Sequence, residues 1–418
     1  MIKKALSSEL AKGSLILFVM FNFYNVLNFV FHFSMGRLLG PENYGVLAVL
    51  MSIIYIYSIP TEAIQNIISK YVSDFNLKEE YGKINFLVSK SSIRAIQFAS
   101  LIFLVSIIIA MFLSKILQIN FYLIILTNVA LITSFTTPIV RGALQGRKKF
   151  VLLGTGMIFE GILKLSFAVI FVLIGFKVFG AIIGLLIGAF AGLIISFYFN
   201  RDIFKEKKET VYFNEVYKKS IPYFIVVFII LVILSLDIIL AKIFFSAEIV
   251  GKYAVLSMLG KIIFFGTIPL GKTMFPLTSE KQDDHKNSMK LFKKSFLMVL
   301  VLCLLAILAY AILPKLIIQI LYGSDYVDMS KYLVYSAIAL SFLSLSNLVL
   351  TYGLSTNKIK NAYYLFFFLI LDIVLLSLFH STILQYLIAF MVSNIVMFIG
   401  SFFFIRYKNE DKHSNSRV

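Results

Sequence analysis

Eight ionisable side chains fall within long apolar runs of this 418-residue sequence, and they are the residues whose chemistry most needs an explanation. The four acids and four bases are Glu62, Glu160, Asp237, Asp372, Lys164, Lys242, Lys261 and Lys272. Inside a lipid bilayer, a charged group costs several kcal/mol unless it is paired or faces water. Each of the eight is therefore a candidate either for handling a charged ligand or for an internal ion pair.

Lys261 and Lys272 are the strongest candidates for binding a negatively charged group. Eleven residues, about three helical turns, separate them, so that one face of a helix carries both. At about 1.5 Å per residue, they stand roughly 16 Å apart along the helix axis. Two interpretations stay open. Either both lysines are cationic stations for an anion, or Lys272 reaches the lipid headgroups while Lys261 pairs with Asp237 or Glu62.

Polar side chains follow helical spacing in two further segments. One series is Tyr55, Ser58, Glu62, Gln65 and Ser69, and the other is Asn25, Asn28 and His32. Such groups suit the hydroxyls of sugars, or water. They equally suit hydrogen bonds between helices, worth about 0.6 kcal/mol each in membranes. We predict Asn25, Asn28, Glu62 and Gln65, together with the two lysines, as binding residues, and we predict no catalytic residue and no metal ligand.

The remaining buried charges allow narrower expectations. Glu160 and Lys164 are four residues apart with the acid first, which is the favourable order for an ion pair on one helix, so we expect them to neutralise each other. Asp372 stands alone in an apolar run, where it either contacts a basic neighbour or is protonated. Lys242 ends its segment and is expected to reach the headgroups.

The composition identifies the elements that must position these residues. Hydrophobic residues make up 60% of the chain and charged residues 14%, with a mean hydropathy of +0.92. Soluble domains carry about 45–50% apolar and about 25% charged residues, so a water-soluble enzyme and a disordered chain are both excluded. Spanning a bilayer takes about 20 apolar residues per helix. The runs are continuous rather than alternating, which predicts an all-α, polytopic membrane protein.

Twelve apolar segments follow one another along the chain. They lie near 13–34, 46–68, 95–114, 121–140, 151–174, 180–199, 221–244, 253–276, 295–313, 333–352, 364–379 and 383–405. Pro60 and Pro269 fall inside the second and eighth segments, where we expect kinks.

The basic residues predict the orientation of these segments. With the N-terminus in the cytoplasm, cytoplasmic connections hold 29 Lys and Arg residues and external ones hold 6. This asymmetry places both termini in the cytoplasm. The net charge of +18 is therefore mainly a topology signal, with some attraction to anionic lipid of the inner leaflet, and nucleic-acid binding is not expected.

The chain also reads as two copies of one unit. The connection around Gly45 is repeated around Gly251, 206 residues later, and Gly142 has a weaker counterpart in Gly353. We predict an N-terminal six-helix bundle over 1–205 and a C-terminal one over 206–418, arranged around a central cavity. Parallel repeats of this kind suit a transporter.

Signatures of enzyme chemistry are missing from the sequence. There is no Gly-x-Ser-x-Gly, no His-Glu-x-x-His and no Cys/His metal spacing. The single cysteine, Cys303, allows no disulfide within the chain. We therefore expect a transporter without a cofactor rather than an enzyme.

Residues 35–45, Met-Gly-Arg-Leu-Leu-Gly-Pro-Glu-Asn-Tyr-Gly, closely resemble the opening of bacterial polysaccharide flippases of the O-antigen type. These belong to the multidrug/oligosaccharidyl-lipid/polysaccharide exporter superfamily. The twelve-segment plan and Arg141-Gly142-x-x-Gln145-Gly146 are similar too. The resemblance implies two bundles around a cavity lined by the first, second, seventh and eighth segments.

The resemblance also implies a function. It is the movement of undecaprenyl-pyrophosphate-linked oligosaccharide across the bacterial inner membrane by alternating access, for lipopolysaccharide or another surface glycan. A glycan polymerase and chain-length machinery are the implied partners. Glu62, Asp237 or His32 would respond to a coupling ion. Two alternatives stay open: a drug/cation antiporter of the multidrug and toxic-compound extrusion type, and a membrane glycan polymerase or glycosyltransferase.

Overall fold

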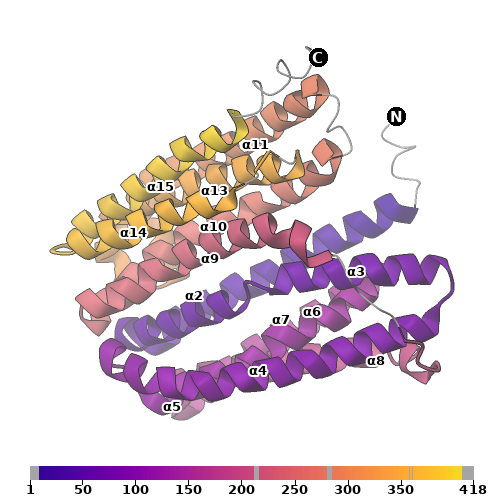
Figure 1. The fold of residues 1–418 in the computed structure, drawn as a ribbon. Coiled ribbons are helices and arrows are strands. Elements are labelled where there is room, and N and C mark those ends of the chain that lie inside the picture. The colour runs from indigo at the N-terminus through magenta and orange to yellow at the C-terminus, as the bar shows by residue number, and fades with distance from the viewer. Residues whose placement is uncertain (1–8, 211–215, 280–284, 357, 360, 407–418) are drawn as a thin grey trace. The chain divides into compact units, whose positions relative to one another are not determined.

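The computed structural model describes residues 9–210, 216–279, 285–356, 358–359 and 361–406 (Figure 1). These residues form helices, and the described part of the chain contains no β-strand. The chain divides into two compact units, Met1–Val216 and Tyr217–Val418. The all-α, polytopic fold predicted from composition is confirmed.

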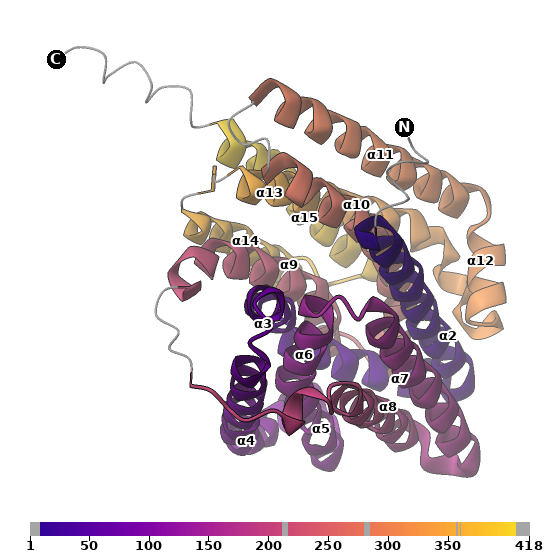
Figure 2. The ribbon, with the colours of Figure 1, turned by 90° about the vertical axis from the view of Figure 1, so that its right-hand side faces the viewer.

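The N-terminal unit holds seven α-helices and two short helical turns. They are α2 (Glu9–Tyr57), α3 (Thr61–Leu77), α4 (Tyr81–Leu117), α5 (Phe121–Asn128), α6 (Ala130–Gly146), α7 (Phe150–Phe171), η1 (Val172–Phe176), α8 (Lys177–Phe199) and η2 (Ile203–Lys205). Helix α7 packs on α2 and α8, while α6 packs on α3, α4 and α8 (Figure 2). Helices α2, α6 and α7 therefore come together inside this unit.

The C-terminal unit is built in a similar way. It contains α9 (Val216–Phe244), α10 (Ala247–Ser279), α11 (His285–Ile312), α12 (Pro314–Leu321), η3 (Ser324–Tyr332), α13 (Leu333–Ser355), η4 (Ala362–Leu365), α14 (Phe366–Leu378) and α15 (Ile383–Arg406). Helix α13 is central, because it packs on α10, α11 and α15. Ser336 of α13 donates a hydrogen bond to the Leu256 carbonyl of α10 over 2.6 Å, which fixes these two helices at close range.

Among the described residues, nine helical segments are long and apolar enough to cross a membrane, and Ala362–Leu378 is a shorter apolar one. Two of the nine are divided at glycines with positive φ, Gly40 (φ +68°) and Gly175 (φ +104°). His32 contacts Tyr55, 23 residues later, which one straight helix would place about 35 Å away, so the chain reverses at Gly40. Counting each divided segment as two passes and adding Ala362–Leu378 gives twelve, which matches the number of predicted passes.

The expected kinks have different outcomes. Helix α2 ends at Tyr57 and α3 begins at Thr61 with Pro60 as its N-cap, so the break predicted at Pro60 is present. Helix α10, in contrast, continues through Pro269 without interruption. The second pass is therefore made of two helical pieces and the eighth of one.

A row of glycines on α8 sets the contact between α7 and α8. Gly180, Gly184, Gly188 and Gly192 recur every four residues, so they share one face. A Cβ at Gly184 would lie 2.2 Å from the Ala168 backbone nitrogen, and one at Gly188 would lie 2.7 Å from the Glu160 carbonyl oxygen. Small residues at such spacing let membrane helices approach closely.

One helix in each unit presents apolar side chains outward. In α4 these include Leu101, Leu104 and Ile108, and in α11 they include Leu297 and Leu304. Only 17% of the most apolar window of either helix is buried within the structure. An apolar surface of this length is stable only against lipid, which agrees with a multi-pass membrane protein.

Candidate functional site: two buried charge clusters

The first cluster lies inside the N-terminal unit and centres on Glu160 of α7. One carboxylate oxygen of Glu160 accepts a hydrogen bond from the Tyr24 hydroxyl of α2 over 2.7 Å. The other oxygen is paired with the guanidinium of Arg141 on α6. Both charged side chains are only 13% exposed, so this is a largely desolvated ion pair that joins three helices.

Lys164 lies one turn beyond Glu160 on α7 but bonds to a different helix. Its ammonium donates a hydrogen bond to the Asn28 side-chain oxygen of α2 and stands 4.8 Å from the centre of the Phe31 ring. The prediction that Glu160 and Lys164 pair with each other is therefore wrong, because each has its main contact with another helix. Glu160 is held by Arg141, and Lys164 is held by an amide and an aromatic face.

The cluster carries one more positive than negative charge, because Glu160 is paired with Arg141 while Lys164 bonds to the uncharged Asn28. Glycines of α8 make room for it. A Cβ at Gly192 would lie 2.4 Å from a carboxylate oxygen of Glu160, and one at Gly188 would lie 2.6 Å from Cβ of Lys164. The glycine row thus lets α7 and α8 approach closely and leaves space for the side chains of Glu160 and Lys164.

Arg141 lies one residue beyond the fourth predicted segment, 121–140, which would place it in a connection, and the structure corrects this. Helix α6 continues to Gly146, five residues beyond Arg141, so the guanidinium lies within the helix. Within this helix, the charge of Arg141 is balanced by Glu160. The sequence did carry a signal, since Gly142-Ala143-Leu144-Gln145 contains no proline and can continue the helix.

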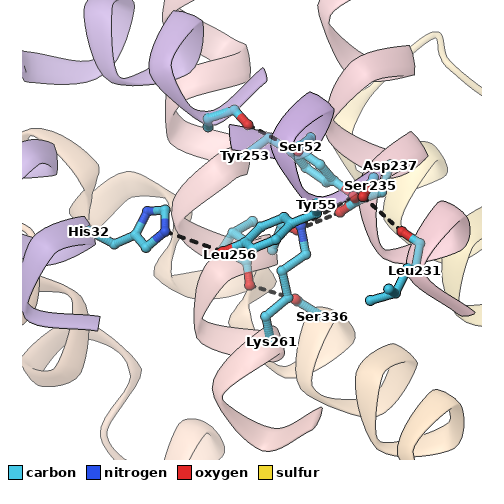
Figure 3. A network of polar contacts seen from close by, with 12 residues as sticks. His32, Ser52, Tyr55, Leu231, Ser235, Asp237, Tyr253, Leu256, Lys261 and Ser336 are labelled. Atoms are coloured by element: carbon cyan, nitrogen blue, oxygen red, sulfur yellow. Dashed lines mark hydrogen bonds and ion pairs between the residues drawn. The ribbon is translucent and has the colours of Figure 1, made fainter. Parts of the chain in front are cut away.

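The second cluster lies inside the C-terminal unit and centres on Asp237 of α9 (Figure 3). One oxygen of Asp237 accepts hydrogen bonds from the hydroxyls of Tyr253, over 3.2 Å, and Ser257, both on α10. The other oxygen lies 3.5 Å from the ammonium of Lys261. In addition, Tyr386 of α15 donates to the backbone carbonyl of Asp237 over 2.6 Å.

Lys261 is 1% exposed and Asp237 is fully buried. Of the two interpretations of Lys261, the structure thus shows pairing with Asp237. The two charged groups are, however, paired at 3.5 Å without a hydrogen bond between them. Among the described residues, neither the ammonium nor the facing carboxylate oxygen makes a hydrogen bond. An ammonium has three donors and normally uses them when buried, whereas that of Lys261 has only the ion pair with Asp237 among the described residues.

Asp372 of α14 is the second buried acid of this unit. Its side chain is fully buried, and one oxygen accepts a hydrogen bond from Ser393 of α15. The other oxygen has no hydrogen-bond partner among the described groups. Of the two possibilities for Asp372, a basic neighbour or protonation, the first does not supply its hydrogen bond, which comes from a hydroxyl.

The other predicted residues have separate surroundings. Gln65 of α3 donates to the side-chain oxygen of Gln145 on α6 over 2.8 Å, and Asn25 is half-buried on α2. Lys272 lies exposed on α10. The side chain of Glu62 lies outside the described residues.

His32 of α2 is buried between two tyrosines. The hydroxyl of Tyr55 lies 3.4 Å from one of its ring nitrogens (Figure 3). The hydroxyl of Tyr44 lies 3.4 Å from the other. Within the described residues, no group of three or more His, Cys, Asp or Glu side chains could hold a metal ion. The chemistry that the two clusters offer is therefore ionic and hydrogen-bonding.

Solved structures with the same fold are transporters. An inward-facing multidrug resistance transporter of the MATE family, in the MOP superfamily, is similar with a TM-score of 0.70 and 12% identity, over 91% of this chain and 94% of that one. The lipid II flippase MurJ in an inward closed conformation gives a TM-score of 0.68 and 15% identity, over 94% and 87%. The eukaryotic MATE transporter AtDTX14 gives 0.67 and 14%, over 95% and 94%. At sequence identities of 12 to 15%, these similarities establish the fold alone.

Fold and composition together define a multi-pass membrane protein with the architecture of the MOP transporters. The sequence narrows this further. Residues 10–282, more than half of the chain, match the family model described as polysaccharide biosynthesis protein, and the chain belongs to that family. A search of curated proteins finds no match.

Proposed function

We propose that this protein is a flippase that moves undecaprenyl-pyrophosphate-linked oligosaccharide from the inner to the outer leaflet of the bacterial cytoplasmic membrane by alternating access. The family to which the chain belongs is one of polysaccharide biosynthesis, and a lipid II flippase shares its fold. Both support a glycan carried on a lipid. The undecaprenyl carrier, the direction of transfer and the inner membrane belong to the proposal.

The observation that carries the proposal is the excess positive charge within the N-terminal unit. Arg141 and Lys164 face one carboxylate between them. A pyrophosphate that leaves water loses its hydration and must be compensated by fixed cations. Arginine is suited to this role because its planar guanidinium binds phosphate oxygens in pairs. We assign Arg141 and Lys164 to the pyrophosphate, with Asn28 positioning Lys164.

In the C-terminal unit, the proposed anion ligand is Lys261. Asp237 supplies the opposite charge to its ammonium while no substrate is bound. An arriving phosphate competes with Asp237 for the ammonium, and the displaced carboxylate takes up a proton or another cation. Asp237 is in this way the proposed coupling group, with His32 and Glu62 as the other candidates.

The remaining predicted residues are assigned to the sugar. Asn25, Gln65 and Glu62 offer hydrogen-bonding groups that replace sugar hydration, and Lys272 offers a further cationic contact. The isoprenoid chain is apolar and stays in the bilayer. A glycan polymerase and chain-length machinery then use the product on the outer side.

One observation favours a second candidate, a drug/cation antiporter. Asp372 is fully buried with one carboxylate oxygen lacking a hydrogen-bond partner among the described residues, and MATE transporters share the fold. A carboxylate oxygen that accepts no hydrogen bond from the described residues suits a cationic substrate. The two candidates differ in the charge of the cargo, which an experiment can decide.

Depletion of the protein in its native cell tests the proposal. We expect lipid-linked oligosaccharide to accumulate on the inner leaflet, where an impermeant lectin reaches it only after lysis, while the surface glycan declines. Unchanged surface glycan, together with new sensitivity to cationic drugs, would instead support the antiporter.

A further inference from the structure

A groove of about 370 Å³ lies on the surface of the N-terminal unit, between α7 and α8. Its walls are apolar and aromatic, and they are formed by Phe159, Ile194, Ile195, Tyr198 and Phe199. Helix α8 ends at Phe199, and Ile194 is five residues earlier, about 8 Å deeper along the helix axis. The groove therefore begins at the end of the helix and extends inward along it.

The groove is held open by rigid packing. The glycine row of α8 fixes the distance to α7, and Gly156 of α7 leaves space opposite Ile195 and Phe199, since an added Cβ would lie 3.7 to 3.9 Å from them. Both helices are continuous over the groove. These contacts leave a concave apolar surface between the two helices.

Positive charge is concentrated where the groove begins. The guanidinium of Arg201 stands 4.3 Å from the centre of the Tyr198 ring, which lines the groove, and Arg201 itself is exposed. Next to it, Asp202 is paired with Arg147 and, over 2.8 Å, with Lys149. Two cations on this one acid leave a positive charge, and Arg201 adds another. Stacking on a ring occupies the face of a guanidinium and leaves its N–H groups free to donate.

We propose that this groove binds an anionic phospholipid, with the phosphate at Arg201 and Lys149 and one acyl chain along Tyr198, Ile194 and Phe159. Charge complementarity selects the occupant, because an apolar slot that ends in basic residues matches a phosphate joined to a hydrocarbon chain. This proposal is independent of the proposed transport function. The predicted orientation places the groove in the inner leaflet, where anionic lipids are enriched.

The chain contains no tryptophan, which allows a direct test. Tyr198→Trp keeps an aromatic ring beneath Arg201 and introduces the sole tryptophan inside the groove. The variant is reconstituted in phosphatidylcholine containing a small, equal fraction of either dibrominated phosphatidylglycerol or dibrominated phosphatidylcholine. We expect the brominated phosphatidylglycerol to quench its fluorescence about fivefold more effectively, the ratio that one basic residue near a surface provides.

Three matched variants make the result specific. Adding Arg201→Ala to Tyr198→Trp should remove the preference, whereas adding Arg94→Ala, which removes an exposed arginine of α4, should not. A sole tryptophan at the lipid-facing Ile170 of α7 should be quenched equally by both lipids.

Equal quenching of Tyr198→Trp by the two lipids would overturn the proposal, as would a preference that survives Arg201→Ala. Loss of the preference when polyprenyl phosphate is added in a small amount would also overturn it, because the tail of a polyprenyl lipid would then be the occupant.

Discussion

The carboxylate of Glu160 is paired with Arg141 of a neighbouring helix, although Lys164 lies one turn away on its own helix. Two cations of the N-terminal unit thereby depend on contacts between helices, and neither is neutralised locally. The same cations therefore hold the helices together and are proposed to bind an anion. Substitutions of these cations test both the stability of the unit and the proposed binding.

Replacing Arg141 with Ala should destabilise the N-terminal unit. Glu160 would remain buried without its cation, which costs about 3–5 kcal/mol for a buried pair. Thermal unfolding of the purified protein in detergent measures the change. Arg141→Met combined with Glu160→Gln should recover most of the stability, because both members of the buried ion pair are removed together while Lys164 keeps its contacts with Asn28 and Phe31, and yet should not restore transport. An Arg141→Ala variant as stable as the exposed-site control Arg94→Ala would contradict the structure.

Lys261→Ala should impair export of the surface glycan while the protein still inserts in the membrane, and Lys261→Arg should retain part of the export. The alanine variant also leaves Asp237 buried without its counter-ion. Lys261→Met with Asp237→Asn removes both charges and separates the two effects, because it should fold well and still not transport. Normal export by Lys261→Ala at wild-type abundance would show that Lys261 is not an anion ligand.

Gly188→Ala should destabilise the contact between α7 and α8. The new methyl group would lie 2.6 Å from Cβ of Lys164 and 2.7 Å from the Glu160 carbonyl, so the helices must separate, at a cost of about 1–3 kcal/mol. Gly266→Ala in α10 is the matched control, because nothing lies within 4 Å of its added Cβ. We expect Gly188→Ala to have a lower unfolding temperature than Gly266→Ala. Equal temperatures would mean that the glycine row is not tightly packed.

Much of the fold could be predicted from the sequence, because a membrane allows few solutions for an apolar segment. The passes, the chain reversal near Gly40 and the break at Pro60 follow from local rules of hydropathy and backbone geometry. The role of the glycine row on α8 was not predicted, because glycine usually indicates a helix break, whereas here it allows close packing. Its four-residue spacing was the available signal.

The charge partners were less predictable, because they depend on which helices become neighbours. The pairing of Lys261 with Asp237 was one of two open interpretations, since both residues lie in adjacent segments. The pairing of Glu160 with Arg141 was missed because the i,i+4 rule favoured Lys164. Local spacing states which contacts are possible, and tertiary packing selects among them.

The link between Arg147 and Asp202 should depend on pH in the acidic range. The hydrogen bond from Arg147, helped by Lys149, holds the pKa of the Asp202 carboxyl well below its ordinary value. A lowered pKa contributes stability that is present above the unfolded value, about 3.9, and is lost as the pH falls towards the folded value. Wild type and Asp202→Asn should thus differ in unfolding temperature between pH 5 and 7, by a small amount for a half-exposed group. The difference should vanish well below about pH 4. A difference that grows on acidification would contradict this assignment.

Cysteine labelling in intact cells tests the predicted orientation. The native Cys303 is buried, so the background should be low. Lys208→Cys lies in the exposed connection after α8, on the predicted cytoplasmic side, and should resist an impermeant thiol reagent until the cells are opened. Ser324→Cys, exposed on the predicted external side, should react at once. The reverse pattern would invert the topology.

Transfer of a fluorescent polyprenyl-pyrophosphate-linked oligosaccharide between leaflets of proteoliposomes is the most direct test. An impermeant reductant destroys the outer-leaflet fluorescence, so transfer appears as a loss beyond the outer-leaflet half. We predict such a loss with the wild type and little of it with the folded Arg141→Met/Glu160→Gln variant. Transfer by both proteins alike, or by neither under an imposed ion gradient, would contradict a flippase that recognises its substrate through buried cations.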